Sequence, residues 1–447
     1  MRDCQLSSLM VLMDAWQNAA WEILNRLRSA GFEAYYVGGC VRDLVMGREP
    51  KDYDIATSAR PDQTLGLFPE GLGVGAQFGV VIVPRPEGPV EVATFRSDSA
   101  YADGRHPSEV RYAESPEEDV RRRDFTINGL LFDPAGQRVI DFVGGQEDIR
   151  ARRIRAIGDP YARFREDHLR MLRAVRFAAR FGFSLDPALR EAVRELAALV
   201  QDVSRERARD EILKILTEGA ARRGFELLDD TRLLEVILPE VKAMQGVQQP
   251  PQFHPEGDVW THTLMMLDGL QKPSATLALA VLLHDVGKPP TFSVRDRIRF
   301  DRHAEVGARM AVEICIRLRL PTRQTQRVEA LVQHHLRFKD LPQMRRSTQL
   351  RFLRMEGFDE HLELHRLDCA ASHGNLSNYE LAGRILRETP VEKIKPQPLL
   401  RGGDLIAQGY SPGPRFKEIL RAVEDAQLEG VIHTREDALR LLADKFP

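Results

Sequence analysis

Cysteine is scarce in this sequence, and long apolar runs are absent from it. The four cysteines never form a Cys-x-x-Cys pair, so the sequence predicts neither a zinc ribbon nor a disulfide framework. No apolar run approaches the ~20 residues that cross a bilayer. The apolar patch LMVLM at residues 9–13 lacks the basic leader and small-residue cleavage site of a signal peptide. We therefore expect no membrane partner and a reducing, cytoplasmic setting.

The chain also lacks a strong net charge, which is −2 over 447 residues. The charge is uneven, because residues 121–180 hold fourteen arginines and no lysine against eight aspartates and glutamates. This local excess favours contact with phosphate groups, although helix faces with internal ion pairs would have the same composition. The length exceeds what one hydrophobic core supports and indicates two to four structural units.

Residues 37–57, which read VGGCVRDLVMGREPKDYDIAT, are the part around which the rest of the chain is organised. Gly38 and Gly39 follow the apolar run AYYV, which is typical of a strand, and precede a short helix that Gly47 closes. A strand, a glycine turn and a helix start together present backbone N–H groups to an anion such as a phosphate.

Two aspartates follow in the same stretch. Asp52 and Asp54 are two residues apart, so on a strand they stand on one face, with Tyr53 and Ile55 on the other. Two carboxylates held that close repel each other unless a hard cation lies between them, and Mg²⁺ bound by carboxylates and substrate phosphates is the expected use. Taken alone, Asp-x-Asp also fits a surface strand with two solvated aspartates.

Together these residues resemble the opening motif of the nucleotidyltransferase superfamily of DNA polymerase β. The strings GG-x-VRD and D-x-DIAT resemble most closely the bacterial (class II) tRNA nucleotidyltransferases, or CCA-adding enzymes, and the related poly(A) polymerases. The resemblance implies that Asp52 and Asp54 are catalytic and bind Mg²⁺. It also implies that Gly38, Gly39 and Arg42 bind the nucleotide.

Three further stretches extend the resemblance. Residues 90–95, VEVATF, read as a strand that carries Glu91, the best-placed candidate for the third carboxylate of such sites; a solvent-facing glutamate is an equal alternative. Residues 101–110 match a flexible loop that the family ties to addition of the terminal A, and the stretch looks complete here. Residues 139–149, VIDFVGGQEDI, resemble a structural turn in which two glycines would form a hinge.

Residues 121–130, RRRDFTINGL, resemble the family motif that selects ribonucleotides. Asp124 and Asn128 are four residues apart and are expected to be neighbours on a helix, where either could bond a ribose 2′-OH. Arg123 and the two arginines before it could meet the triphosphate or the RNA. The family usually has alanine where this chain has Gly129, a departure that removes one methyl group.

Residues 163–183 show helical periodicity, and Glu166, Asp167 and Arg170 within them resemble the base-reading motif of the family. Asp167 and Arg170 are three residues apart and are expected to share a helix face. A carboxylate accepts from the exocyclic amino group of C or A, and a guanidinium donates to the ring nitrogen beside it, whereas G and U present a carbonyl to the carboxylate. Glu166 could orient Arg170 through an i,i+4 pair. Ordinary surface ion pairs would have the same spacing.

The helical pattern continues beyond this motif. The resemblance also assigns Arg173 and Arg176 to nucleotide binding. Residues 204–219 predict a helix that braces the neck, with Glu211 and Lys214 exposed.

A second constellation lies in the C-terminal half. Residues 275–289, ATLALAVLLHDVGKP, predict a buried helix that ends in His284 and Asp285, a pair that is costly to bury unless it binds something. The string resembles an HD domain, a metal-dependent phosphohydrolase fold, whose ligand order matches His262, His284, Asp285 and Asp368. Imidazole and carboxylate ligands leave the divalent metal unidentified.

A second metal of this domain would use His303 and His334. His335 is expected to point away from it, because adjacent helix residues differ by about 100° in direction. A retained fold without phosphohydrolase activity is the alternative.

These features predict an α+β protein. We expect a nucleotidyltransferase head with a small mixed β-sheet and helices, then an all-α neck, a body with the HD domain and a tail, at residues 1–150, 151–225, 226–385 and 386–447. The expected function is template-independent addition of C, C and A to the 3′ end of tRNA from CTP and ATP. The resemblance implies two-metal nucleotidyl transfer with a protein template, with Mg²⁺ in the head and an unidentified divalent metal in the HD domain. A poly(A) polymerase and a CC-only or A-only enzyme are alternatives with the same head. A nucleotide phosphohydrolase or signalling enzyme with a regulatory head is a third.

Overall fold

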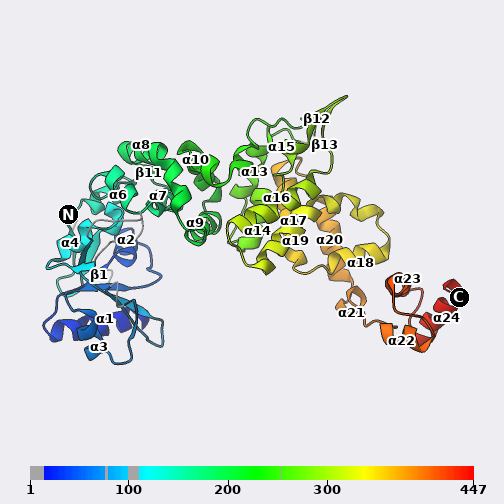
Figure 1. Cartoon of the computed structure of the whole chain (residues 1–447), viewed down its shortest axis with the longest axis horizontal. Coiled ribbons are helices and arrows are strands. Elements are labelled where there is room, and N and C mark those ends of the chain that lie inside the picture. The colour runs from blue at the N-terminus through cyan, green and yellow to red at the C-terminus, as the bar shows by residue number, and fades with distance from the viewer. Residues whose placement is uncertain (1–14, 76–78, 99–109, 253, 447) are drawn as a thin grey trace. The chain divides into compact units, whose positions relative to one another are not determined.

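The computed structural model describes residues 15–75, 79–98, 110–252 and 254–446. The chain divides into two compact units, residues 1–239 and 240–447, which run from blue to green and from green to red in Figure 1. The finer boundaries expected at residues 150, 225 and 385 stay predictions. No helix of the described residues is long and apolar enough to cross a membrane.

The first unit is built on a seven-stranded mixed sheet. Apolar and β-branched runs such as AYYV, VVIV and VEVAT form its strands because their alternate side chains bury against the core. β2 and β5 run parallel, and the other neighbouring pairs are antiparallel. In sheet order the strands are β3 (Leu72–Gly75), β4 (Val80–Val83), β5 (Val90–Thr94), β2 (Asp54–Thr57), β1 (Ala34–Val37), β8 (Leu130–Asp133) and β9 (Arg138–Asp141).

Short helices and one small ribbon complete the head around this sheet. In Figure 1, α1 and α3 lie on one side of β1, and α2 and α4 lie on the other. The ribbon pairs β6 with β7 and flanks the stretch expected to be a loop, of which residues 99–109 lie outside the described part. The elements are α1 (Ala15–Ser29), α2 (Gly39–Val45), α3 (Pro61–Leu67), β6 (Arg96–Asp98), β7 (Val110–Tyr112), α4 (Pro116–Arg121), the 3₁₀ turn η2 (Thr126–Asn128) and α5 (Gly145–Arg150).

The rest of the first unit is helical and centres on α7 (Leu169–Phe181). This helix buries Leu172, Val175 and Ala179 along one stripe and packs against α9 and α10. It ends at Gly182, whose left-handed φ of 68° suits a residue without Cβ. The neighbouring elements are α6 (Pro160–Glu166), α8 (Pro187–Leu196), η3 (Ala197–Asp202), α9 (Arg205–Thr217), α10 (Ala221–Asp230) and α11 (Leu233–Ile237).

The second unit is a helical body followed by three further helices. α14 is apolar all round because α13, α17 and α19 enclose it. The body contains α13 (Val259–Asp268), α14 (Ala275–Leu283), α15 (Lys288–Thr291), α16 (His303–Arg317), α17 (Thr322–His334), η4 (His335–Gln343), α18 (Arg346–Leu353), α19 (Phe358–Ala371), α20 (Ser377–Glu388) and α21 (Val391–Ile394). α12 (Pro239–Lys242) precedes it, and α22 (Gly402–Ala407), α23 (Pro414–Leu428) and α24 (Arg435–Lys445) follow.

The α+β class and the mixed sheet in the head are confirmed, with one correction of detail. The region after the head is not all-α. β10 (Arg153–Ile154) pairs in parallel with β11 (Ser184–Leu185), and β12 (Phe292–Val294) pairs antiparallel with β13 (Ile298–Phe300). Strands of two or three residues are too short to give a periodic signal in the sequence.

Candidate active site and metal centre

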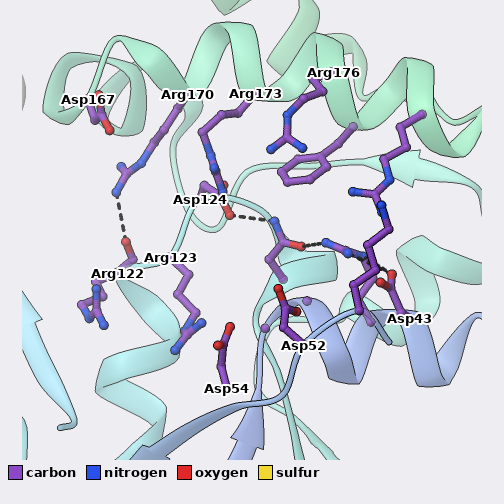
Figure 2. Close-up of a pocket in the computed structure, with 17 residues that line it drawn as sticks. Asp43, Asp52, Asp54, Arg122, Arg123, Asp124, Asp167, Arg170, Arg173 and Arg176 are labelled. Atoms are coloured by element: carbon purple, nitrogen blue, oxygen red, sulfur yellow. Dashed lines mark hydrogen bonds and ion pairs between the residues drawn. The ribbon is translucent and has the colours of Figure 1, made fainter. Parts of the chain in front are cut away.

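The two predicted catalytic aspartates line one cavity of about 470 Å³ in the first unit (Figure 2). β2 begins at Asp54, so Asp52 lies on the segment just before the strand rather than within it. Asp52 is exposed and Asp54 is half-buried. The cavity is lined by Gly38, Gly39, Arg42, Asp43, Lys51, Asp52, Asp54, Arg122, Arg123, Asp124, Asn128, Asp167, Arg170, Arg173, Arg176, Phe177 and Arg180.

The charge state of Asp54 is strongly perturbed. Burial, together with the negative charges of Asp52 and Glu91, raises the pKa of the Asp54 carboxyl to about 7, while Arg123 opposes the shift. Glu91 is on β5, the parallel neighbour of β2, and its side chain is exposed outside the cavity lining. The negative charges of Asp52 and Glu91 thus disfavour ionisation of Asp54, and a divalent cation beside Asp54 would relieve this repulsion.

The glycine turn lies beside one of the cavity's arginines. Gly38 has a φ of 73°, and a Cβ at this position would come within 3.2 Å of Arg123 Nη1. Arg123 is anchored on its other edge by Asp119, whose carboxylate accepts from Arg123 Nη2 at 2.9 Å. The predicted short helix is present, but α2 begins at Gly39 itself rather than after it. The glycine turn and the Arg123 guanidinium therefore line the same part of the cavity. Arg121 is exposed and paired with Glu117 instead.

A continuous hydrogen-bond network joins the predicted ribose-selecting residues (Figure 2). Asn128 Nδ2 donates to Asp124 Oδ1 at 3.0 Å, and Arg42 Nη1 donates to Asn128 Oδ1 at 2.7 Å. Arg173 donates twice to Asp124 Oδ2, at 2.8 and 2.6 Å. Burial would raise the pKa of Asp124, but Arg173, Asn128 and the Phe125 N–H outweigh it and lower the value to about 2. The two residues are in contact as predicted, although η2 between them is a 3₁₀ turn and not an α-helix.

The predicted base-reading pair also lines this cavity, but not from one helix. α6 ends at Glu166, Asp167 is extended, and α7 begins at Leu169. Asp167 Oδ1 accepts from the Leu169 N–H at 3.1 Å, and Asp167 Oδ2 accepts from Arg207 Nη2 of α9 at 2.8 Å. The expected shared helix face is therefore wrong, and a capped helix junction brings Asp167 beside Arg170 instead.

Glu166 contacts Arg170 as its spacing predicted. Glu166 Oε2 accepts from Arg170 Nη1 at 2.6 Å and from Arg163 Nη1 at 2.9 Å. Arg170 also donates to the carbonyl oxygens of Arg163 and Arg122, both at 3.1 Å. These contacts fix the Arg170 guanidinium in one orientation.

One face of the cavity is a cluster of arginines around an aromatic ring that the sequence analysis missed. The guanidinium carbons of Arg176, Arg173 and Arg42 lie 4.2, 5.2 and 5.5 Å from the centroid of the Phe177 ring. Arg176 donates to Glu211 Oε2 at 2.5 Å. Glu211 is therefore buried and not exposed as predicted, because it neutralises a buried arginine.

Two predicted features of the head depend on close packing. Asp141 Oδ1 accepts from the N–H groups of Val143, Gly144 and Gly145, and a Cβ on Gly145 would lie 2.2 Å from the Thr126 carbonyl oxygen. Packing therefore accounts for these glycines, and the hinge stays a prediction. At Gly129, a Cβ would lie 2.9 to 3.1 Å from three apolar side chains. These side chains therefore occupy the space that an alanine methyl group would need.

The second unit brings the predicted HD ligands together. His262, His284 and Asp368 form one group, and Asp285, His303 and His335 form a second, each with ligand atoms within 4.8 Å of one another. Asp285 Oδ1 lies 3.6 Å from His303 Nε2 and 3.8 Å from His335 Nε2. Ligands at about 2.0–2.2 Å from a single ion have spacings of this size.

His335 belongs to this centre, and the expected His334 does not. α17 ends at His334, and the 3₁₀ segment η4 begins at His335. His335 is buried beside Asp285, whereas the His334 ring lies 6.2 Å from that of His361. Only one of two adjacent histidines faces the site, as the sequence argument required, but periodicity did not identify which one.

Three of the histidines are oriented in the same way. Nδ1 of His284, His303 and His335 lies 2.8, 2.8 and 2.7 Å from the carbonyl oxygen three residues earlier. A carbonyl only accepts, so each Nδ1 carries the proton and each Nε2 presents a lone pair. Nε2 of His284 and His303 and Oδ1 of Asp285 are buried without a hydrogen-bond partner. The donor set therefore fits one or two divalent metal ions.

Two residues beside this centre were missed in the sequence. Glu256 Oε1 lies 2.7 Å from His262 Nδ1 and 2.9 Å from His254 Nδ1. His262 Nε2 faces Asp368 Oδ1 at 3.1 Å, so the ring lies between two carboxylates, although neither contact has the geometry of a straight hydrogen bond. Burial lowers the pKa of His262, but Asp368 and Glu256 outweigh it and raise the value to about 9. The spacing His-x-Glu just before the helix of His262 was the available signal.

Three described families match the chain in order along its length. "Poly A polymerase head domain" matches residues 34–155, "Probable RNA and SrmB- binding site of polymerase A" matches residues 182–245, and "HD domain" matches residues 258–366. The first match contains the Asp52–Asp54 site, and the third contains the histidine cluster except for Asp368.

Individual proteins give similar results. The chain is 31% identical over 428 residues to the CCA-adding enzyme of Bacillus cytotoxicus, which covers 94% of this chain and 96% of that protein. It is 45% identical to the CCA-adding enzyme of Geobacillus sp. (strain WCH70) over 227 residues, so that alignment spans only 51% of this chain and 56% of the relative. The crystal structure of the Bacillus stearothermophilus CCA-adding enzyme in complex with CTP superposes with a TM-score of 0.75 at 28% identity, covering 97% of this chain and 98% of that one.

Proposed function

Because this chain belongs to the CCA-adding enzyme family, we propose that it adds C, C and A to the 3′ end of tRNA, using CTP and ATP. The observation that carries the proposal is a single cavity lined by Asp52 and Asp54 together with Asp167 and Arg170. The carboxylates suit nucleotidyl transfer, and the second pair suits recognition of a base. The cytoplasm, where these substrates occur, is the proposed place of the reaction.

The chemistry follows from the charges of the cavity. Asp52 and Asp54 would hold two divalent cations, which we take to be Mg²⁺; these would supply activation of the RNA 3′-OH and neutralisation of the triphosphate for in-line displacement of pyrophosphate. The turn at Gly38 and Gly39 offers backbone N–H groups to the triphosphate. Arg123 Nη1 faces the same turn, so its guanidinium would hold the phosphate oxygens against these groups.

Asp167 and Arg170 would read the base. Asp167 would accept from the exocyclic amino group of C or A, and Arg170 would donate to the adjacent ring nitrogen. Arg207 and the Leu169 N–H hold Asp167, and Glu166 holds Arg170, so the pair is oriented before a nucleotide binds. An unpaired polar contact costs about 1–3 kcal/mol, so two such contacts would reject UTP and GTP.

Asn128 is the better candidate for the ribose contact. Asp124 already accepts two hydrogen bonds on each carboxylate oxygen, from Arg173, from Asn128 and from the Phe125 N–H. A carboxylate has about four acceptor sites, so Asp124 is saturated. Asn128 Nδ2 has a second N–H, which would donate to the 2′-oxygen while Arg42 fixes the other end of the amide.

The test uses purified protein, Mg²⁺ and tRNA transcripts that end before CCA, after C and after CC. Each is incubated with CTP and ATP separately and together, and the products are resolved at single-nucleotide resolution. Growth by CCA followed by a stop is the expected result. A stop after CC, or growth of the CC-ended transcript alone, would mean a CC-only or an A-only enzyme. A long A ladder would mean a poly(A) polymerase.

A second activity is proposed for the HD centre, because Nε2 atoms and a carboxylate oxygen converge there without partners. The residues His262, His284, Asp285, His303, His335 and Asp368 would hold one or two divalent ions. Bound metal would polarise a phosphate ester and supply hydroxide for its hydrolysis. The expected result is metal-dependent release of phosphate from phosphomonoesters, or metal-dependent ring opening of cyclic phosphates to phosphomonoesters, that is lost in Asp285→Asn; equal rates in the two proteins would contradict it.

A further inference from the structure

Of the four histidines in the HD centre, only His262 is without a carbonyl behind its ring. His284, His303 and His335 each donate Nδ1–H to a neutral backbone oxygen. At His262 the corresponding position is occupied by the carboxylate of Glu256, 2.7 Å from Nδ1. His262 and the Glu256 side chain are almost completely buried.

The distances decide what Glu256 does there. His254, Glu256 and His262 are close enough together to suggest a third metal position. The contacts of Glu256 Oε1, at 2.7 and 2.9 Å, are too short for two ligands of one metal ion; the contact with His254 is a hydrogen bond, whereas the contact with His262 has the distance of one but not its angle. Two ligands of one tetrahedral ion with bonds of about 2.1 Å would be about 3.4 Å apart. The spacings around Asp285, at 3.6 and 3.8 Å, are compatible with such an ion, and those around Glu256 are not.

We propose that Glu256 is a positioning residue of the HD metal centre, which fixes the Nδ1–H tautomer of His262 and turns Nε2 toward the metal. This inference rests on the proposed metal centre. A carboxylate behind a ligating imidazole also makes its other nitrogen a stronger donor than a carbonyl does. His254, on the other side of Glu256 Oε1, restrains the carboxylate. His262 is therefore the most strongly donating of the four histidine ligands.

The experiment measures binding of Mn²⁺ to the full-length protein after treatment with a chelator. All variants carry Asp52→Asn and Asp54→Asn, so that only the HD centre binds tightly. Glu256→Gln keeps an acceptor without the charge, and Glu256→Met keeps the approximate volume without an acceptor. We expect Mn²⁺ affinity to fall by about 10–100-fold in Glu256→Gln and further in Glu256→Met. The control Glu305→Gln alters an exposed glutamate on α16 that pairs with Arg302, and its affinity should match that of the parent.

Three results would overturn the inference, and they are distinguishable. If Glu256→Gln and Glu256→Met both bind Mn²⁺ as the parent does, while Asp285→Asn does not, the metal centre exists and Glu256 has no role in it. If Asp285→Asn also binds like the parent, the proposed metal centre itself fails. Equal losses in Glu256→Gln and Glu256→Met would show that the acceptor contributes nothing. Addition of CMP and AMP by the same Glu256 variants with an intact head reports that the chain is folded, and it should be unchanged.

Discussion

The surroundings of the Asp54 carboxyl group disfavour its charged form. Its pKa of about 7 arises from burial and from the nearby charges of Asp52 and Glu91. Repulsion between the carboxylates destabilises the metal-free protein. A bound divalent ion would relieve this repulsion, which increases the affinity for the ion. Asp52, which is exposed, can adjust its position, whereas Asp54 is fixed by the pairing of β2 with β1 and β5.

Replacement of Asp54 should therefore abolish chemistry without abolishing RNA binding. We expect Asp54→Ala to lower incorporation of CMP and AMP by at least ~10³-fold, because several kcal/mol of transition-state stabilisation depend on the metal. Affinity for tRNA, measured by filter binding, should stay within about twofold. Asp62→Ala, at an exposed position of α3 outside the cavity, is the matched control. Retained CMP incorporation in Asp54→Ala would refute the metal assignment.

Asp124 shows the opposite perturbation and leads to a prediction about pH. Its pKa is about 2 in the folded protein, against an ordinary value of 3.8. The folded state therefore binds the proton less readily, so the stabilisation is complete above pH ~4 and is lost between about pH 4 and pH 2. Asp124→Asn should lower the free energy of unfolding by about 2–3 kcal/mol at pH 7, and the difference from the parent should shrink as the pH falls.

Urea denaturation tests this effect in the first unit alone when Trp260 is replaced by phenylalanine. The remaining tryptophans, Trp16 and Trp21, both lie on α1. Asp210→Asn, on the exposed side of α9, is the control and should show no comparable loss. A stability difference for Asp124→Asn that is the same at pH 7 and pH 3 would mean that the charge of Asp124 is not its source.

Among the elements, strands and helices with strong patterns were predictable, and their junctions were not. The residues that form β1, β4, β5 and α14 are apolar enough for these elements to be predicted from their own sequence, without knowledge of their partners. β3 reads LGVG, and its two glycines conceal a strand that depends on pairing with β4. The break between α6 and α7 at Asp167 is not marked by a glycine or proline. It is stabilised instead by Arg207 of α9, which lies far away in the sequence.

The candidate site was predictable to a similar degree. The resemblance to family motifs identified the cavity residues Asp52, Asp54, Asp124 and Arg170, which spacing alone would not have distinguished from surface ion pairs. Partners that come from elsewhere in the chain were missed. Glu211 was expected at the surface, because a sequence does not show that Arg176 lies buried opposite it. Glu256 precedes its helix in a segment without periodicity and was missed for the same reason.

The junction between α6 and α7 should control nucleotide choice. Arg170→Ala removes the donor to the ring nitrogen, and Asp167→Ala removes the acceptor; each should relax rejection of UTP or GTP by about 10–100-fold. Glu166→Gln should have a smaller effect in the same direction, since it only loosens Arg170. Competition between CTP and UTP on a transcript that ends before CCA measures the ratio. Arg165→Ala, exposed on α6, is the control. Undiminished discrimination in Arg170→Ala would refute the template role.

On the scale of the whole molecule, the two proposed centres lie in separate compact units and share no residue. Substitutions at such sites usually act independently. Asp285→Asn should abolish metal binding in the HD centre and change the rate of AMP addition by less than about twofold. Asp54→Ala should abolish AMP addition and leave metal binding in the HD centre unchanged. Steady-state nucleotide addition and Mn²⁺ binding, measured on both variants and on the double variant, test this. A loss of nucleotide addition in Asp285→Asn would mean that the HD metal supports the head.

The strand order of the head also has a consequence for how the protein is made on the ribosome. β1 lies between β2 and β8, and Tyr36 pairs with Phe132. At about 5–20 residues per second, roughly 5–20 s separate the synthesis of these two partners. During that time one edge of β1 is unpaired, and an unpaired strand edge is a template for aggregation. The nascent head therefore exposes this edge of β1 until β8 has been synthesised and β1 becomes an internal strand of the sheet.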